Sequence, residues 1–197
     1  MPHVQPPLLA PTVASTIAAQ SQLTHEPSGK TETALFASGC FWGTEHIFRQ
    51  YYDGRGLVDA RVGFTGGDVK DPGYRRVCQG DTGHAEACKV EFDPGLVSFA
   101  ELVEFFYRSH DPTTLNRQGG DMGTQYRSAI FYTTPSQKST AEEVTRQVQE
   151  KHFSPKGKEI VTQIVEAGQW WDAEEYHQLY LEKNPNGYQC STHRIWF

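Results

Sequence analysis

Aromatic residues are absent from the first part of this chain and frequent in the rest. No Phe, Tyr or Trp occurs before Phe36, although aromatic residues make up 12% of the 197-residue sequence. The segment before Phe36 is instead rich in Pro, Ser, Thr, Ala and Gln. Such a segment lacks the large apolar side chains whose burial would offset the entropy lost on ordering. We therefore predict a disordered N-terminal extension over residues 1–31 and a single folded domain over residues 32–197.

The composition argues against several classes of protein. The formal net charge of −6 disfavours a nucleic-acid-binding surface. No run of about 18 apolar residues occurs, which disfavours a membrane-spanning helix. The 4 cysteines show no Cys-x-x-Cys spacing, which disfavours a disulfide scaffold and a zinc ribbon. We therefore expect a monomer that binds no metal, nucleic acid or membrane.

The N-terminal segment has few features of a targeting peptide. Mitochondrial transit peptides are rich in Arg, whereas this segment has no Arg and its first lysine is Lys30. A secretory signal needs a longer apolar stretch than Leu8-Leu9-Ala10. We therefore expect a cytoplasmic protein, with an organelle as the alternative location.

From Glu32 onward, segments typical of strands alternate with segments typical of helices. Ser98 and Glu101 match a capping box at the start of one of these helices. The mixed order predicts an α+β fold, a two-layer sandwich around a mixed, mostly antiparallel sheet. A long irregular C-terminal tail is expected over residues 184–197. Strands are predicted over residues 35–37, 57–64, 84–92, 128–132 and 160–165, and helices over residues 41–52, 99–109, 136–152 and from 172 to about 183.

The pentapeptide Gly39-Cys40-Phe41-Trp42-Gly43 joins a predicted strand to a predicted helix. A cysteine in the first turn of a helix lies near unpaired backbone N–H groups, which favour the thiolate and make the sulfur nucleophilic. Phe41 and Trp42 would supply an apolar, polarizable wall suited to a small methyl group. The alternative is a structural cysteine buried beside two core aromatic residues.

Glu86 follows this site in the chain as a candidate proton donor. If Glu86 lies on the face of its strand that is directed toward Cys40, burial beside aromatic residues would raise the pKa of Glu86 and keep its carboxyl group protonated. An exposed strand glutamate is the commoner outcome for such a residue. His84 is a candidate base in a Cys/His hydrolase pair, although a structural histidine is more frequent.

Residues 111–127 form a long polar segment, and a structureless loop of this length inside a compact domain is usually functional. The segment contains Asp121 and Tyr126, and Tyr74 lies in another stretch rich in turn residues. A phenol in such a position can point into a cleft and donate a hydrogen bond, although loop tyrosines are more often simply packed. Asp121 either orients a neighbouring side chain of the site or caps a turn.

Cys190 lies in a segment rich in Gly, Pro and Asn near the C-terminus. Such a cysteine has the freedom to approach another sulfur and to trap a sulfenic acid as a disulfide. The alternative is an incidental free thiol. Cys78 and Cys88 have apolar neighbours, and we predict that both are inert packing residues.

Several of these strings together resemble the peptide methionine sulfoxide reductase A family. The similarity extends from about residue 32 to the last residues and leaves out only the N-terminal segment. Each string alone is weak, but their common order is highly specific. The matching strings are Gly39-Cys40-Phe41-Trp42-Gly43, Gly83-His84-Ala85-Glu86, His110-Asp111-Pro112-Thr113, Gly123-Thr124-Gln125-Tyr126-Arg127-Ser128 and Ala173-Glu174-Glu175-Tyr176-His177-Gln178.

The resemblance implies an enzyme that reduces the S epimer of methionine sulfoxide, free or in proteins. Cys40 would attack the sulfoxide sulfur and remain as a sulfenic acid after methionine departs. Glu86 would protonate the sulfoxide oxygen, while Tyr74 and Tyr126 would donate hydrogen bonds to it. The family uses no metal or bound organic cofactor.

The resemblance also implies roles for the remaining candidates. Phe41 and Trp42 would hold the S-methyl group, and Asp121 would help to order the site. Cys190 matches the tail cysteine that resolves the sulfenic acid as a disulfide. Thioredoxin would then reduce the disulfide between Cys40 and Cys190.

The chain departs from the family pattern at a few positions. Phe64 stands where Tyr is common, which removes one hydroxyl group, and Met122 stands where a non-sulfur residue is usual. This chain has one tail cysteine, Cys190, whereas some relatives have two. A mechanism with two cysteines that ends at Cys190 is therefore favoured. The alternatives are a cysteine hydrolase and a redox-sensing binding protein in which Cys40 and Cys190 form a switch without turnover.

Overall fold

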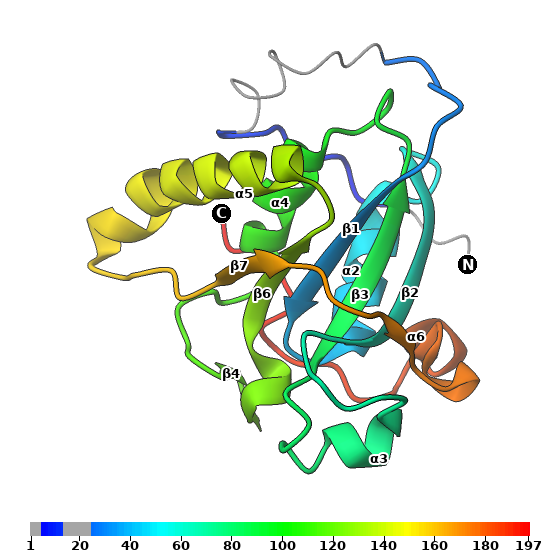
Figure 1. Cartoon of the computed structure of the whole chain (residues 1–197). Coiled ribbons are helices and arrows are strands. Elements are labelled where there is room, and N and C mark those ends of the chain that lie inside the picture. The colour runs from blue at the N-terminus through cyan, green and yellow to red at the C-terminus, as the bar shows by residue number, and fades with distance from the viewer. Residues whose placement is uncertain (1–4, 14–24) are drawn as a thin grey trace.

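The computed structural model of this chain describes residues 5–13 and 25–197, and Figure 1 shows how its elements are arranged. The strands are β1 (Glu32–Ser38), β2 (Leu57–Thr65), β3 (Ala85–Phe92), β4 (Arg117–Gln118), β5 (Asp121–Met122), β6 (Ser128–Tyr132), β7 (Gln163–Glu166) and β8 (Trp171–Asp172). The α-helices are α2 (Phe41–Tyr52), α3 (Gly73–Val77), α4 (Phe99–Arg108), α5 (Pro135–Val148) and α6 (Tyr180–Lys183). The shorter turns of helix are η1 (Thr124–Tyr126), η2 (Gln149–Phe153), η3 (Ser154–Lys156) and η4 (Glu175–His177).

The main sheet has 6 strands in the order β7-β6-β1-β3-β2-β8. β3 lies between β1 and β2 and is antiparallel to both. β1 is also antiparallel to β6, and β2 to β8, whereas β6 and β7 are parallel. β1 and β2 therefore run in the same direction, and α2 connects them across β3. The prediction of an α+β fold with a mixed, mostly antiparallel sheet is confirmed.

Alternation along the strands divides their side chains between two faces of the sheet. In β1, Phe36 faces the helices, whereas Leu35 and Ala37 belong to a cluster on the opposite face. The Phe36 ring stacks on Phe48 of α2 at 5.2 Å and on Phe106 of α4 at 5.3 Å between ring centroids. These contacts fix the helical layer to the centre of the sheet.

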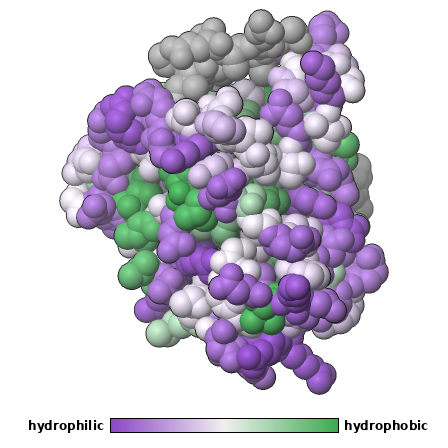
Figure 2. Space-filling view, viewed as in Figure 1, coloured by the Kyte–Doolittle hydropathy of each residue, from purple (hydrophilic) through white to green (hydrophobic). Residues whose placement is uncertain are grey.

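Figure 1 shows α2 behind the central strands, with α4 and α5 to its left on the side of β6 and β7. The chain between β7 and β8 crosses in front of the sheet, where Ala167 and Trp170 pack against the second apolar cluster. Figure 2 shows that this side of the molecule is mostly hydrophilic, with hydrophobic residues in small separate patches. Within the described residues, no helix is long and apolar enough to cross a membrane.

Part of the N-terminal segment contacts the helical layer. The buried Glu104 carboxylate accepts the backbone N–H of Thr12 at 2.6 Å and that of Val13 at 3.0 Å. Arg108 Nη1 donates to the carbonyl oxygen of Ala10 at 2.9 Å. The prediction of a disordered extension did not anticipate these contacts, because they depend on a buried acid in a distant helix. Residues 1–4 and 14–24 of that predicted extension lie outside the described residues.

The helix predicted from Asp172 to about residue 183 is wrong over most of its length. Asp172 instead pairs with β2 as part of β8, and only residues 180–183 form an α-helix. The Gln178 side chain bonds to the backbone of β2 through Val62, and Leu179 adopts a left-handed conformation. These contacts with β2 outweigh the helical preference of the segment. The described residues 184–197 contain no helix or strand, in agreement with the predicted irregular tail.

The capping residue of α4 provides a test of this fold. The Ser98 side chain accepts the Glu101 N–H at 3.1 Å. Since that N–H has no partner within the helix, we expect Ser98→Ala to lower the free energy of unfolding by about 1 kcal/mol. Urea denaturation followed by circular dichroism measures the change. Ser139→Ala on the exposed surface of α5 is the control, and equal effects of the two substitutions would contradict the capping role.

Candidate active site

Cys40 lies between the end of β1 and the first turn of α2, as its pentapeptide predicts. Its side chain is only 6% exposed. Gly39 has φ +95°, and a Cβ atom there would lie 2.5 Å from the Gln118 Cβ. Glycine is therefore required at this turn, since any larger residue would displace the loop that covers the cysteine.

Burial controls the protonation of Cys40. It raises the pKa of the thiol well above its usual value, and the nearby Glu86 charge raises it further. The backbone N–H groups of Trp42 and Gly43 lower the pKa but do not outweigh burial. The prediction that the helix start favours a resting thiolate is therefore wrong, because the desolvation of the sulfur is the larger effect. The thiolate has to form during the reaction.

Glu86 extends from β3 toward the first turn of α2. It is 1% exposed, and its Oε2 accepts the backbone N–H of Phe41 at 3.1 Å. Burial raises the pKa of Glu86 to about 8, with the Phe41 N–H opposing and the Asp121 charge adding to the shift. The alternation along β3 places Glu86 on the helix-facing side together with Cys88 and Val90. A carboxyl group of this kind is protonated near neutral pH and can donate a proton beside the Cys40 sulfur.

Phe41 and Trp42 contribute to an aromatic cluster beside the cysteine. Phe41 is buried against Phe64 at 5.7 Å between ring centroids and lies 6.2 Å from Tyr74. Trp42 stacks on Tyr180 at 3.8 Å with an interplanar angle of 15°. Because Phe64 packs its ring against Phe41, the side chain at this position adds apolar surface and no hydroxyl group to the cluster.

The Trp42 indole is also held by a histidine that the sequence analysis did not select. Its Nε1 donates to His177 Nδ1 at 3.1 Å, and the His177 ring lies 4.3 Å from that of Tyr74. His177 belongs to the string Ala173–Gln178, which carries part of the family resemblance. This match was the feature of the sequence that could have identified His177 as a candidate site residue. The indole is therefore fixed on two sides by segment 177–180.

Tyr74 and Tyr126 both lie near Glu86. Burial raises the pKa of each phenol, and a hydrogen bond with Cys78 adds to the shift at Tyr74. The charges of Glu86 and Cys78 raise the pKa of both phenols further. Cys40 also raises the pKa of Tyr126. The phenols therefore keep their protons and can donate hydrogen bonds. Tyr74 belongs to α3 and Tyr126 to η1, so two separate loops bring these donors to one place.

Asp121 and Tyr188 connect the long loop with the C-terminal tail. Tyr188 Oη donates to Asp121 Oδ1 at 2.8 Å, whereas Oδ2 is buried without a hydrogen-bond partner among the described residues. Burial, Asp121 and the charges of Cys190 and Cys40 raise the pKa of Tyr188. Tyr188 therefore lies near both sulfurs. The sequence analysis missed this residue, although it is adjacent to the Gln189-Cys190 pair.

Cys190 contacts the same loop that covers Cys40. Its side chain is 2% exposed, and its Sγ lies 3.6 Å from the Gln118 carbonyl oxygen. Gln118 also packs against Gly39, so a single turn lies between the two cysteine segments. All 4 cysteines are free thiols and lie among the described residues. The structure therefore represents the reduced form of the chain.

The other two cysteines differ from each other. Cys88 is fully buried in the core opposite Phe36, as predicted for a packing residue. The same prediction is wrong for Cys78, which is exposed at the end of α3 and contacts Tyr74. Cys78 follows the last residue of α3, and the buried side chain at this end of the short helix is that of Val77.

His84 is not placed to activate Cys40. Its Nε2 donates to the Val69 carbonyl oxygen at 2.7 Å, and its Nδ1 accepts the Gly67 N–H at 3.2 Å. Both ring nitrogens are therefore occupied by the backbone of one loop, which disfavours a Cys/His hydrolase. In the part of the chain that the structure describes, no group of three or more His, Cys, Asp or Glu side chains is arranged to hold a metal.

Comparisons with known proteins agree with this geometry. A family model described as peptide methionine sulfoxide reductase matches residues 32–195. A protein of Schizosaccharomyces pombe named "probable peptide methionine sulfoxide reductase" is 53% identical over 163 residues, covering 82% of this chain and 95% of the relative. The solved structure of reduced Mxr1 from Saccharomyces cerevisiae has a TM-score of 0.80 and 42% identity, covering 85% of this chain and 93% of that chain.

A second solved structure contains the same yeast protein with a partner. Mxr1 in complex with Trx2 has a TM-score of 0.58 and 28% identity to this chain, covering 85% of this chain and 91% of that chain. The family match extends over most of the sequence and includes every residue of the candidate site, from Cys40 to Cys190. The chain belongs to the peptide methionine sulfoxide reductase family.

Proposed function

We propose that this chain reduces the S epimer of methionine sulfoxide to methionine, acting on the free amino acid and on oxidised proteins. The observation that carries the proposal is the pairing of a buried cysteine with a buried carboxyl group whose pKa is about 8. Expulsion of oxygen from a sulfoxide needs a nucleophile at sulfur and a proton on oxygen. Cys40 and Glu86 would supply these two requirements.

The first step transfers oxygen from the substrate to Cys40. The S-methyl group would lie against Phe41 and Trp42, with the sulfoxide oxygen directed toward Glu86. Glu86 gives its proton to the sulfoxide oxygen while the Cys40 sulfur attacks the sulfoxide sulfur, and the carboxylate that results takes the proton of the thiol. The bond between the substrate's sulfur and oxygen then breaks, and the hydroxyl group passes to the Cys40 sulfur. Methionine leaves with two electrons gained, Cys40 remains as a sulfenic acid, and Glu86 is protonated again.

Three further residues would assist this step without a net gain or loss of protons: Tyr74, Tyr126 and Asp121. The two phenols would donate hydrogen bonds to the sulfoxide oxygen as negative charge develops on it. Asp121 would order the site through Tyr188, which it binds directly. An aromatic wall on one side and hydrogen-bond donors on the other would accept one epimer and exclude the other.

The second step would regenerate the enzyme. The Cys190 thiol attacks the Cys40 sulfenic acid, which forms a disulfide and releases water. Two thiols of thioredoxin would then reduce the disulfide. The common turn that both cysteine segments contact supports the pairing. The solved complex of yeast Mxr1 with Trx2 supports a thioredoxin-type partner.

We also propose the wider setting of the enzyme. Residues 32–197 would act as a single catalytic domain and as a monomer, with no bound cofactor and no nucleic-acid or membrane partner. The net charge of −6 supports the absence of a nucleic-acid partner. A cytoplasmic location is proposed, with an organelle as the alternative. A cysteine switch without turnover is the competing function, and sustained sulfoxide reduction with thioredoxin would contradict it.

The protonated Glu86 carboxyl group predicts the pH dependence of kcat/KM for sulfoxide reduction. Below a pH of about 8 Glu86 holds the proton that the sulfoxide oxygen needs. The rate should therefore be nearly constant toward neutral pH and fall as the pH rises through about 8, where Glu86 loses its proton. Rapid-mixing measurements of a single turnover over this pH range test the profile.

Glu86→Gln should remove both the acid and the charge that raises the pKa of Cys40. We expect a rate about 10²–10⁴-fold lower near neutral pH, without the fall in rate that the ionisation of Glu86 causes at higher pH. Glu91→Gln, on the same strand but away from the site, is the matched control and should leave the profile unchanged. A wild-type profile in Glu86→Gln would remove Glu86 from the mechanism.

Substitution of Cys190 tests the second step. Cys190→Ser should release one equivalent of methionine per enzyme and then stop in the presence of thioredoxin, because the sulfenic acid is not converted to a disulfide. Mass spectrometry of the wild type after one equivalent of sulfoxide should find a disulfide between Cys40 and Cys190. Cys78→Ser is the control, since it removes another thiol near the site and should keep full recycling. Normal turnover by Cys190→Ser would assign resolution to another residue.

A further inference from the structure

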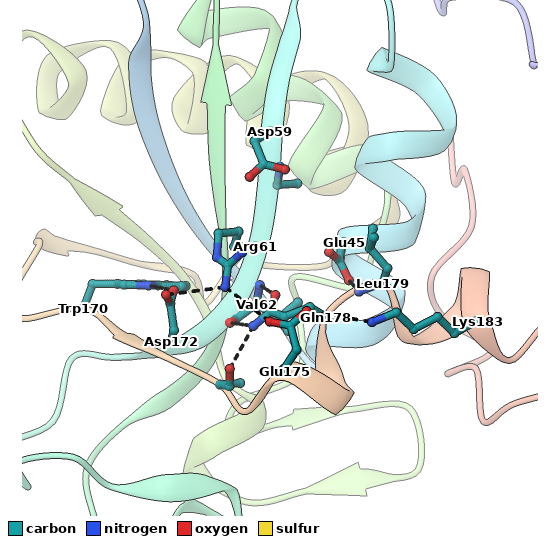
Figure 3. A network of polar contacts seen from close by, with 12 residues as sticks. Glu45, Asp59, Arg61, Val62, Trp170, Asp172, Glu175, Gln178, Leu179 and Lys183 are labelled. Atoms are coloured by element: carbon teal, nitrogen blue, oxygen red, sulfur yellow. Dashed lines mark hydrogen bonds and ion pairs between the residues drawn. The ribbon is translucent and has the colours of Figure 1, made fainter.

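Glu45 is a buried carboxylate of α2 that the proposed reaction does not use. It is 2% exposed, and its Oε2 accepts the backbone N–H of Leu179 at 2.9 Å. Figure 3 shows Glu45 reaching from α2 toward Leu179, with Gln178 beside Val62 of β2. Burial of a carboxylate is unfavourable, and burial raises the pKa of Glu45 to about 7 although Arg49 opposes the shift.

The residue that Glu45 binds has an unusual backbone conformation. Leu179 has φ 55° and ψ 35°, in the left-handed region that side chains other than glycine rarely adopt. Such a conformation persists where the surrounding contacts determine it. Gln178 supplies one set of contacts, because its Nε2 donates to Val62 O at 2.8 Å and its Oε1 accepts the Val62 N–H at 2.8 Å. Glu45 supplies the contact at Leu179 itself.

The turn at Leu179 connects the two residues that hold the Trp42 indole. His177 precedes the turn and accepts the indole N–H at 3.1 Å, while Tyr180 follows it and stacks on the indole at 3.8 Å. A change in the turn would therefore move both supports of Trp42 together. Glu45 lies on the same helix as Trp42. One rigid helix therefore carries both the indole and the carboxylate that binds the Leu179 turn.

We propose that Glu45 is a positioning residue for the methyl-binding wall. By holding the N–H of Leu179 it keeps His177 and Tyr180 against Trp42 and so sets the width of the site for the substrate S-methyl group. The inference rests on the proposed role of Phe41 and Trp42 in binding that group. Its chemical consequence is selectivity between methyl and larger alkyl sulfoxides.

A second set of contacts at Glu45 serves the helix rather than the wall. Arg49 Nε lies 3.5 Å from Glu45 Oε1, and Arg49 Nη2 binds Asp59 at 2.7 Å and the Ala60 carbonyl oxygen. These contacts join α2 to β2. Their loss would lower stability without altering the Leu179 turn, and this difference separates a positioning role from a purely structural one.

The test compares substitutions that keep or lose the bond to Leu179. Glu45→Gln retains an amide oxygen that accepts the Leu179 N–H. Glu45→Ala loses the acceptor, and Glu45→Asp keeps the charge near Arg49 but is one methylene too short. Asp59→Asn is the matched control, because it weakens the Arg49 contacts and leaves the Leu179 bond intact. If Glu45→Ala does not fold, Glu45→Asp carries the test.

The first readout is the ratio of kcat/KM for methionine sulfoxide to that for ethionine sulfoxide, both as S epimers. One extra methylene is typically worth about 10–200-fold in such a ratio. We expect the ratio to fall at least about threefold in Glu45→Ala and Glu45→Asp and to stay within about twofold of wild type in Glu45→Gln and Asp59→Asn. A lower fraction of folded enzyme does not change the ratio.

The second readout does not depend on activity. The indole N–H signal of Trp42, identified by its loss in Trp42→Phe, should shift in nuclear magnetic resonance spectra of Glu45→Ala and Glu45→Asp but not of the other two variants. An unmoved signal, or a moved signal with an unchanged ratio, would overturn the proposal for Glu45. A wild-type enzyme without preference for methyl would instead contradict the proposed role of Phe41 and Trp42, while the indole signal still tests the link from Glu45.

Discussion

The hydrogen bond between the buried Glu86 carboxyl group and the Phe41 N–H joins the two halves of the site. It attaches the first turn of α2 to the central strand β3, at the place where Cys40 leaves β1. The pairing of β3 with both β1 and β2 places this strand in the interior of the sheet. An acid placed there is kept from water, and the same burial keeps both Glu86 and Cys40 protonated at rest.

The aromatic wall depends on a different kind of support. Phe41 is fixed by core packing, since it follows directly from the helix start and lies against Phe64 of β2. Trp42 lies farther out and is fixed by segment 177–180, whose own conformation depends on polar contacts. The two rings of one wall therefore have different main supports. His177 lies next to both of them, because its ring is 5.3 Å from that of Phe41 and 5.5 Å from that of Trp42.

Local features of the sequence predicted a large part of this structure. The helix predicted over residues 41–52 has the bounds of α2, and the strand predicted over residues 84–92 differs from β3 by one residue. The remaining errors have tertiary causes. Contacts between Gln178 and β2 replace most of the predicted final helix. Burial of Cys40 under a loop distant in sequence raises the pKa of its thiol, where a thiolate was predicted.

The tail that carries Cys190 is attached to the domain on both sides of this cysteine. Tyr188 is bound to Asp121 before it, and Arg108 donates to the Phe197 carbonyl oxygen at 2.7 Å after it. A thiol held on such a short double tether has a high effective concentration at the sulfur it attacks. Disulfide formation between Cys190 and oxidised Cys40 would then be a first-order event. Its rate would be the same in dilute and concentrated enzyme and would exceed that of competing small thiols, which must first diffuse to a covered sulfur.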